Sequence, residues 1–308
     1  MTKYVIRRII GLIPTLFVIV TICFFFIRLA PGGPFDRERK IPKAVQDNIE
    51  RKYHLDEPLI MQYGRYMLDI LRGDLGPSFR YRDFNVNYYI FKALPPSAVL
   101  GALALLLAVT LGIAVGMISA VRQNTWVDYS TMATAIVGIT VPTFVIGPVL
   151  MFIFAVKLKW LPVAGWIGDL GLAALILPVL TLSFNYFAYI ARLSRASILE
   201  VLRSDYIRTA KAKGLNFTVI MFRHVLKGAL LPVVSYLGPA FAAIVTGSIV
   251  VEVIFRVPGL GRYFVTSALN RDYTMIMGTV IVYSVFLVFA NFIVDIVYGF
   301  LDPRISYA

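Results

Sequence analysis

Cysteine, histidine and acidic residues are scarce in this chain of 308 residues, which has one cysteine, two histidines and 17 Asp and Glu residues. The single cysteine, Cys23, excludes an intrachain disulfide and a cysteine-based metal centre. The phosphate-loop, His-Glu-x-x-His and Gly-x-Ser-x-Gly patterns of several enzyme classes are missing from the sequence. We therefore expect no catalytic residues, no metal site and no cofactor in this chain, and no ATP hydrolysis by it.

Charged residues are also few. They make up 15% of the chain against 59% for hydrophobic residues, and the mean hydropathy is +0.78. Because about a quarter of a soluble domain is charged, this composition predicts an all-α membrane protein with several spans. The net charge of +13 could indicate a nucleic-acid partner. The cations lie between apolar runs, however, which favours orientation in a lipid membrane and no contact with nucleic acid.

The N-terminal segment has the basic start and apolar run of a signal peptide. Its apolar run is about nineteen residues long and is followed by no small-x-small cleavage pattern, so we interpret it as a retained membrane helix. We expect Arg28, at the far end of this run, to extend to the membrane interface.

Six apolar runs are long enough to cross about 30 Å of hydrocarbon as helices. They are Ile9–Leu29, Ala98–Val121, Ala133–Val156, Leu172–Ala191, Leu230–Val251 and Ile276–Phe300. Prolines at 142 and 148, and the Gly238–Pro239 pair, predict distortion of the third and fifth spans. In the second span Ala108, Gly112 and Gly116 recur at four-residue spacing, a pattern that serves close helix packing within this subunit or against a partner.

The distribution of Lys and Arg predicts the orientation of the spans. The short connections on one side, with both termini, hold thirteen of these cations, eight of them between Arg192 and Lys227, against five on the other side. The positive-inside rule then places both termini and residues 192–229 in the cytoplasm. The expected layout is a cytoplasmic start and first span at 1–29, an outer insertion at 30–96, spans two to six at 97–302 and a cytoplasmic tail at 303–308.

The sequence of the outer insertion predicts a small helical unit. One helix is expected to start at Pro42 and to run through Val45, Ile49 and Tyr53. A second should begin near Pro58 and end at the Gly73–Pro77 turn. Its apolar face would hold Leu59, Tyr63, Tyr66, Met67 and Ile70. The insertion could be a platform for a partner or a simple cap on the outer mouth.

Ionisable residues are nearly absent from the spans: only Glu252 and Asp295 are acidic near the apolar runs, and both lie close to a span end. This argues against a proton- or sodium-coupled carrier, which uses buried ionisable groups and paired broken helices. Several polar side chains could line a passage, although each is also compatible with simple packing. These candidates are Thr140, Thr143, Ser183, Asn185, Tyr186, Ser235, Tyr236 and Asn291.

The long polar stretch Glu200–Pro232 interrupts the second half of the chain. Its sequence predicts two short helices separated by Gly214, followed directly by an apolar span. A basic loop placed by the positive-inside rule would explain the charge alone. It would not explain the helix–Gly–helix layout, with the small residues Ala210 and Ala212 among the cations. We therefore interpret the stretch as a docking element.

The run from Asp205 to Gly214, followed by Arg223–His224 and Leu230–Pro232, resembles the EAA loop of bacterial ABC-importer membrane subunits. The similarity is closest to the B-type permease of the oligopeptide and dipeptide importers. Glu200–Leu202 reads Glu-Val-Leu where the loop's name would have Glu-Ala-Ala. Further similar stretches are Arg7–Arg8 with Pro14–Thr15, Leu29–Gly32, Gly73–Gly76, Glu252–Gly261, Asn270–Tyr273 and Asp302–Arg304.

This resemblance implies a type I importer fold and a non-catalytic permease that forms half of a passage across the inner membrane. The implied partners are a second, non-identical permease, one or two ABC ATPase subunits that hold ATP and Mg²⁺, and an extracytoplasmic solute-binding protein. The implied ATPase contacts are Asp205, Tyr206, Arg208, Thr209, Ala210, Lys211, Lys213 and Gly214. The candidate binding-protein contacts are Glu252, Arg256, Arg262 and Arg271.

The implied substrate is an oligopeptide or dipeptide. Related permeases also carry nickel, oligosaccharides or antimicrobial peptides, so these solutes remain alternatives. A stand-alone secondary carrier is the competing class of function.

Overall fold

The computed structural model describes residues 2–29, 51, 53–81, 84–245 and 249–301. In these ranges the regular structure is helical, apart from one isolated bridge between Pro77 and Asn85. The longer helices are α1 (Thr2–Leu29), α3 (Leu59–Leu71), α4 (Val86–Val121), α5 (Trp126–Thr140), α8 (Ala173–Leu202), α12 (Leu231–Val245), α14 (Leu260–Asn270) and α15 (Tyr273–Leu301). The shorter ones are α6 (Thr143–Leu150), η1 (Met151–Lys157), α7 (Ile167–Leu170), α9 (Asp205–Ala212), α10 (Phe217–Val219), η2 (Ile220–Val225), α11 (Leu226–Ala229) and α13 (Ile249–Ile254).

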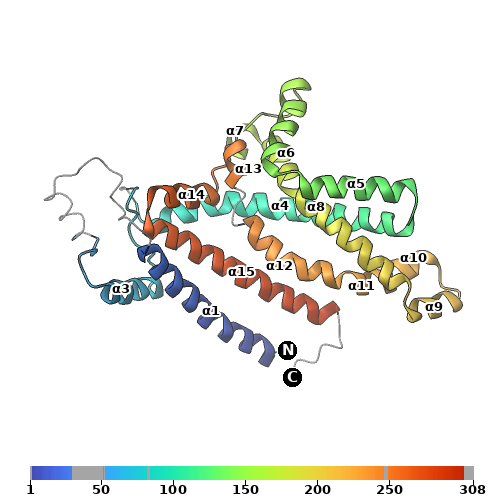
Figure 1. Ribbon diagram of the computed structural model, residues 1–308, viewed down its shortest axis with the longest axis horizontal. Coiled ribbons are helices and arrows are strands. Elements are labelled where there is room, and N and C mark those ends of the chain that lie inside the picture. The colour runs from blue at the N-terminus through green and yellow to red at the C-terminus, as the bar shows by residue number, and fades with distance from the viewer. Residues whose placement is uncertain (1, 30–50, 52, 82–83, 246–248, 302–308) are drawn as a thin grey trace.

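Four helices, α1, α4, α8 and α15, are long and apolar enough to cross a membrane singly. Two further spans are bent pairs, α5 with α6–η1 at 110° and α10–α11 with α12 at 52°. With each bent pair counted as one span, the described residues contain the six spans expected from the sequence. Figure 1 shows α3 and α14 at one end of the molecule and α9 to α11 at the other.

The third expected span, Ala133–Val156, is wrong as a straight helix. The chain is extended at Val141 and Pro142, with ψ of 121° and 145°, before α6 starts at Thr143. Proline restricts the residue before it to extended conformations and cannot donate an amide hydrogen bond, so the helix ends there. The run is therefore an elbow, in which α5 lies along α4 and α8 while α6 turns away (Figure 1).

The fifth expected span also differs from the prediction. The bend falls at Leu230, and the described helix α12 continues through Gly238 and Pro239, where distortion was expected. Gly238 serves close packing, because a Cβ there would lie 2.6 Å from Oδ1 of Asn291 on α15. Helix α4 begins at Val86, ten residues before the expected boundary at 96, so that boundary lies inside a helix.

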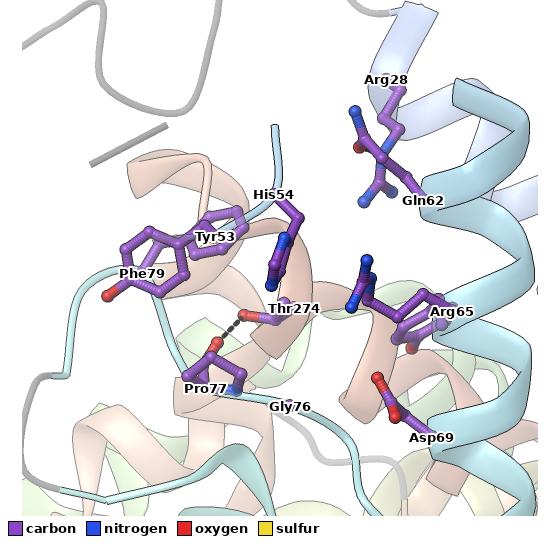
Figure 2. Close-up of a pocket in the computed structure, with 11 residues that line it drawn as sticks. Arg28, Tyr53, His54, Gln62, Arg65, Asp69, Gly76, Pro77, Phe79 and Thr274 are labelled. Carbon is purple, nitrogen blue, oxygen red and sulfur yellow. Dashed lines mark hydrogen bonds between the residues drawn. The ribbon is translucent and has the colours of Figure 1, made fainter. Parts of the chain in front are cut away.

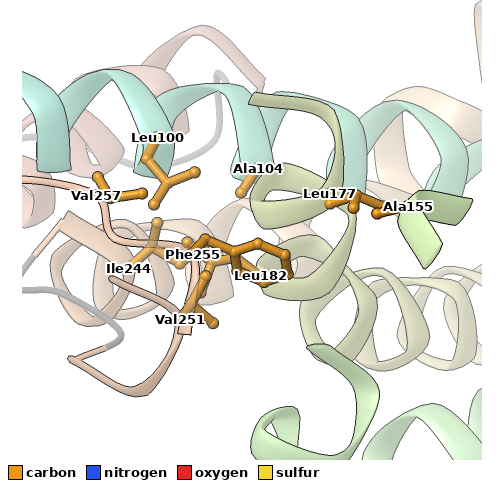
Figure 3. Close-up of a cluster of buried hydrophobic side chains, with 9 residues drawn as sticks. All are labelled: Leu100, Ala104, Ala155, Leu177, Leu182, Ile244, Val251, Phe255 and Val257. Carbon is orange, nitrogen blue, oxygen red and sulfur yellow. The ribbon is translucent and has the colours of Figure 1, made fainter. Parts of the chain in front are cut away.

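The centre of the molecule is the contact between α4 and α8. A Cβ on Gly112 would lie 2.8 Å from Ile190, and one on Gly116 would lie 2.6 Å from the carbonyl oxygen of Ala191. The small-residue face of the second span therefore packs within this subunit. Beside it, an apolar cluster joins these two helices to α12, α13 and η1 (Figure 3). Its members are Leu100, Ala104, Ala155, Leu177, Leu182, Ile244, Val251, Phe255 and Val257.

The second helix of the outer insertion is present as α3. Of the residues expected on its apolar face, Tyr63, Tyr66, Met67 and Ile70 pack against α1 and α15, whereas Leu59 is 45% exposed. The first expected helix, from Pro42, lies outside the described residues except for part of its end. Because α3 covers the end of α1, Arg28 does not simply extend outward. Its guanidinium lies 3.6 Å from the centre of the Phe24 ring.

Candidate functional site

Helix α9 and the turn after it make up the central part of the stretch that the sequence predicted to be a docking element. Two residues on one face, Ile207 and Ala210, are buried in an apolar cluster formed with α4, α8, η2 and α11. The hydrogen bonds from the amides of Ile207 and Arg208 to the Ser204 carbonyl start the helix. The cluster therefore holds α9 against its own subunit and presents the opposite face of the helix to solvent.

The exposed face carries all but one of the expected ATPase contacts. They are Asp205, Tyr206, Arg208, Thr209, Lys211, Lys213 and Gly214. Nη1 of Arg208 lies 3.3 Å from the Asp205 carboxylate across one turn, both exposed. The Tyr206 hydroxyl lies against Gly228, where a Cβ would be 3.2 Å from its oxygen. This places the tyrosine hydroxyl against α11.

Ala210 does not lie on that face. Its side chain is 7% exposed and packs in the internal cluster, so the expected contact with an ATPase is replaced by one within the subunit. The reason is the three-residue spacing from Ile207, which puts both side chains on the same face of the helix. A small side chain at 210 allows α9 to lie close to the bundle.

Gly214 ends the element in a left-handed turn with φ of +77°. Its amide donates to the Lys211 carbonyl at 2.9 Å, and the Leu215 amide donates to the Ala210 carbonyl at 3.3 Å. This pattern is a common helix C-terminus, in which glycine avoids the cost of positive φ. The turn expected at Gly214 is thus present.

A buried ion pair fixes the helix that leads into α9, and sequence reasoning missed it. Nε and Nη2 of Arg195 on α8 donate to the two carboxylate oxygens of Asp128 on α5, at 2.6 and 2.7 Å. The same carboxylate accepts from Ser119 Oγ on α4 at 2.5 Å and from the Asn124 amide at 2.9 Å. These four hydrogen bonds tie three helices together just before α9.

The candidate passage residues fall into two groups. Tyr186 on α8 and Tyr236 on α12 lie near each other, with ring centres 6.5 Å apart, and Tyr236 stacks on Tyr189 at 4.2 Å. The Asn185 Oδ1 atom on the same helix is buried and has no hydrogen-bond partner among the described residues. This polar and aromatic patch on α8 and α12 is the only part of the expected set that the described structure gathers into one place.

The other passage candidates are engaged locally or lie apart. The hydroxyls of Thr140, Ser183 and Ser235 donate to carbonyl oxygens in their own helices, at 2.9, 3.0 and 3.0 Å. Thr143 is the first residue of α6, beyond the elbow. Asn291 packs against Gly238 between α12 and α15.

Glu252 is misassigned as a binding-protein contact, because it is 1% exposed. Its Oε1 accepts from Ser97 Oγ on α4 at 2.7 Å, and Ser97 Oγ accepts from the Leu260 amide at 2.7 Å. A Cβ on Gly259 would lie 2.4 Å from the Glu252 carboxyl carbon. Glu252 therefore holds the turn between α13 and α14. Sequence alone placed it at a span end, where exposure is the ordinary expectation.

The three arginines of the expected outer contact differ in their surroundings. Arg256 and Arg262 are exposed, on either side of the turn that Glu252 holds. Arg271 is half-buried and ends α14 in a left-handed conformation with φ of +56°. The next residue, Asp272, is buried and starts α15, with its Oδ1 accepting from the Met275 amide at 3.2 Å. It also accepts from Ser78 and from the Phe79 amide, which joins the insertion to the last span.

Comparisons with known proteins agree with this architecture. Residues 112–307 match the family "Binding-protein-dependent transport system inner membrane component". Residues 1–82 match "Binding-prot-dependent transport system membrane comp, N-term". One chain of a solved structure titled as inward-facing conformations of the MetNI methionine ABC transporter has a TM-score of 0.56 and 17% identity. The match covers 70% of this chain and 97% of that one, and it shows a shared fold, that of type I importer membrane subunits.

Curated relatives match over the whole length. The oligopeptide transport system permease protein OppB of Salmonella typhimurium is 50% identical over 307 residues, covering 100% of both chains. The dipeptide transport system permease protein DppB of Bacillus subtilis is 45% identical, covering 99% of this chain and 98% of its own. The glutathione transport system permease protein GsiC of Pectobacterium atrosepticum is 40% identical, covering 100% of both. The chain thus belongs to the family of binding-protein-dependent transport system inner membrane components.

Proposed function

We propose that this chain is one of two non-identical permease subunits in an ATP-driven importer that carries oligopeptides or dipeptides across the bacterial inner membrane. The observation that carries the proposal is the full-length match, at 50% and 45% identity, to permeases named for oligopeptide and dipeptide transport. In this complex the chain supplies half of the passage and performs no covalent chemistry.

The geometry of α9 supports the coupling role. An ABC ATPase subunit, which would hold ATP and Mg²⁺, would contact the exposed face that carries Tyr206, Arg208 and Lys211. Ile207 and Ala210 pack the buried face of α9 against the bundle. A displacement of α9 by the ATPase would therefore also displace the bundle. Helix α8 ends at Leu202, two residues before Ser204, and Arg195 ties it to α5 and, through Asp128, to α4. ATPase closure would therefore move these three spans together.

The proposed orientation places α9 and both chain ends in the cytoplasm, with α3 and α14 outside. The extracytoplasmic binding protein would then meet the outer surface near Arg256 and Arg262, with Arg271 close by in sequence. The partly exposed patch of Tyr186, Tyr189 and Tyr236 would face the passage or the second permease. Aromatic rings suit peptide side chains of many kinds, because they offer apolar surface without strict hydrogen-bond requirements.

Assembly and substrate can be tested in one strain. The chain is expressed with its second permease, ATPases and binding protein in cells that lack peptide import. We expect the tagged chain to purify with the second permease and the ATPases, and the cells to take up a labelled tetrapeptide. An excess of unlabelled peptide should block that uptake, whereas glutathione or nickel should not. Blockage by glutathione or nickel alone would assign a different solute to the same architecture.

A further inference from the structure

A small polar pocket lies at the outer end of the molecule, and the coupling and passage surfaces do not use it. It encloses about 120 Å³ between the end of α1, helix α3, the loops at 53–54 and 76–79, and the start of α15. Figure 2 shows Arg28, Gln62 and Arg65 on one side and the rings of Tyr53 and Phe79 on the other.

Arg28 brings to this pocket a positive charge that no carboxylate of the described residues pairs with. Its Nε donates to Gln62 Oε1 at 3.1 Å, and its guanidinium covers the Phe24 ring. Among the described residues no carboxylate oxygen lies within ion-pair distance of it. A partly buried cation without an anionic partner is costly, because the protein supplies less solvation than water does. The Nη hydrogens therefore remain available to an anion.

Tyr66 adds a second donor. Its side chain is 8% exposed and lines the same pocket, and its hydroxyl has no hydrogen-bond partner among the described residues. Buried hydroxyls are rarely left without a partner, because the lost hydrogen bond costs free energy. Burial raises the pKa of this phenol well above its usual range, so it keeps a proton to donate. Two donors from different helices thus have unused capacity at one place.

The other charged groups of the pocket are already engaged or lie further along α3. Nη2 of Arg65 lies 2.7 Å, and Nδ1 of His54 3.0 Å, from the same oxygen of Glu57. Asp69 stands one turn beyond Arg65 and would repel an anion at that end. The Arg28 end is therefore the favourable place for negative charge. Opposite it, Tyr53 and Phe79 pack edge to face at 4.8 Å and form an apolar wall.

We propose that this pocket binds the carboxylate of a small solute at the outer surface, with Arg28 and Tyr66 donating to its oxygens. The planar guanidinium matches the geometry of a carboxylate, and the aromatic wall accommodates the carbon atoms attached to it. The volume admits a carboxylate on a short chain and no large ligand. The inference concerns the pocket alone and does not depend on the transported solute.

Ligand-observed NMR tests the proposal on the full-length chain in phosphatidylcholine nanodiscs. The probe is N-acetylglycine, and N-acetylglycinamide, which has the same shape without the charge, is the matched ligand. We expect saturation transfer to the acid and little transfer to the amide. Equal transfer to both would overturn the proposal, because it would show that the charge is not recognised. Glycerol phosphate binding at least about tenfold more tightly than the acid would overturn it as well, in favour of a phosphate headgroup site.

Variants locate the binding. Tyr66→Phe removes only the hydroxyl and should weaken binding about tenfold, the usual worth of a hydrogen bond to a charged group. Arg28→Lys keeps the charge but loses the planar guanidinium that can donate two parallel hydrogen bonds, and it should weaken binding by a similar factor. Arg72→Met, on the exposed end of α3 and away from the pocket, is the matched control and should leave binding unchanged. Unchanged affinity in both pocket variants, with folding confirmed by thermal unfolding, would refute the assignment.

Discussion

Asp128 and Arg195, 67 residues apart in the chain, meet in a two-point ion pair that joins α5 to α8. The Asp128 side chain is buried, and Ser119 donates to it from α4. Helix α8 ends at Leu202 and α9 begins at Asp205, so Arg195 lies in the last turns of the helix that leads into α9. A displacement of α9 that moved α8 would therefore act on three helices and not on α8 alone.

The ion pair predicts an asymmetric effect of substitutions. Arg195→Met leaves a buried carboxylate without its cation, and breaking one partner of such a pair costs about 3–5 kcal/mol. Replacing both, as in Asp128→Leu with Arg195→Met, should recover most of that stability, because no charge is then buried. The apparent unfolding temperature in nanodiscs measures this. A double variant less stable than the Arg195→Met variant would contradict the assignment.

The two faces of α9 should respond differently to a large side chain. Thr209 is exposed, so Thr209→Trp should leave the permease stable while the ATPases no longer purify with it. Ala210 is buried, so Ala210→Trp should overpack the cluster and destabilise the subunit by about 1–3 kcal/mol or more. Lys227→Gln, exposed and outside α9, is the control and should change neither property. ATPase retention by the Thr209→Trp variant would show that this face is not the contact.

Gly214 gives a backbone prediction that does not involve crowding. A Cβ there would meet no atom within 4 Å, but φ is +77°. Gly214→Val should therefore strain the turn by about 1–2 kcal/mol, and Gly214→Asn should strain it less. Hydrogen exchange at the Leu215 amide should rise in the same order, with ATP-driven uptake falling. Gly64→Ala, in open space on α3, should be neutral or stabilising, and equal effects at the two glycines would refute the turn argument.

The orientation of the bundle can be tested by labelling. In a Cys23→Ser background, Arg72→Cys directly after α3 and Lys227→Cys on α11 place single thiols at exposed positions at opposite ends. An impermeant thiol reagent added to intact cells that lack the outer membrane should label the first and leave the second unlabelled. Labelling of both from outside would be incompatible with the proposed topology.

The number and approximate positions of the spans could be predicted because hydropathy and helix length are local properties. Distortion of the third span at Pro142 was predicted, but the size of that bend and the position of the bend in the fifth span were not. A proline shows where a helix can break, whereas the 110° angle depends on packing of α5 against α8 and of α6 against α13. The surroundings of Arg28 could not be predicted either, because they depend on α3 covering the end of α1.

The outline of the candidate site could also be predicted, because helix-forming runs and a glycine turn are local features of the sequence. The helix–Gly–helix layout predicted α9 and its turn. Which face of α9 the bundle buries depends on tertiary packing, so Ala210 was wrongly expected on the exposed face. Asp128 was missed because an acid near the start of an apolar run resembles an ordinary span end. Its partner is 67 residues away, and no local pattern links the two. Glu252 was misassigned because it also lies near a span end, where an acidic residue is ordinarily exposed.

The central claim is that the chain imports solute only as part of an ATP-driven complex. The most direct measurement is the accumulation of a labelled tetrapeptide in proteoliposomes that contain the complete complex with its binding protein. The account predicts accumulation that requires ATP, and its loss when the ATPases or the binding protein are omitted or when Thr209→Trp is introduced. Accumulation by this chain alone, driven by a proton or sodium gradient without ATPase subunits, would contradict the account and establish a secondary carrier.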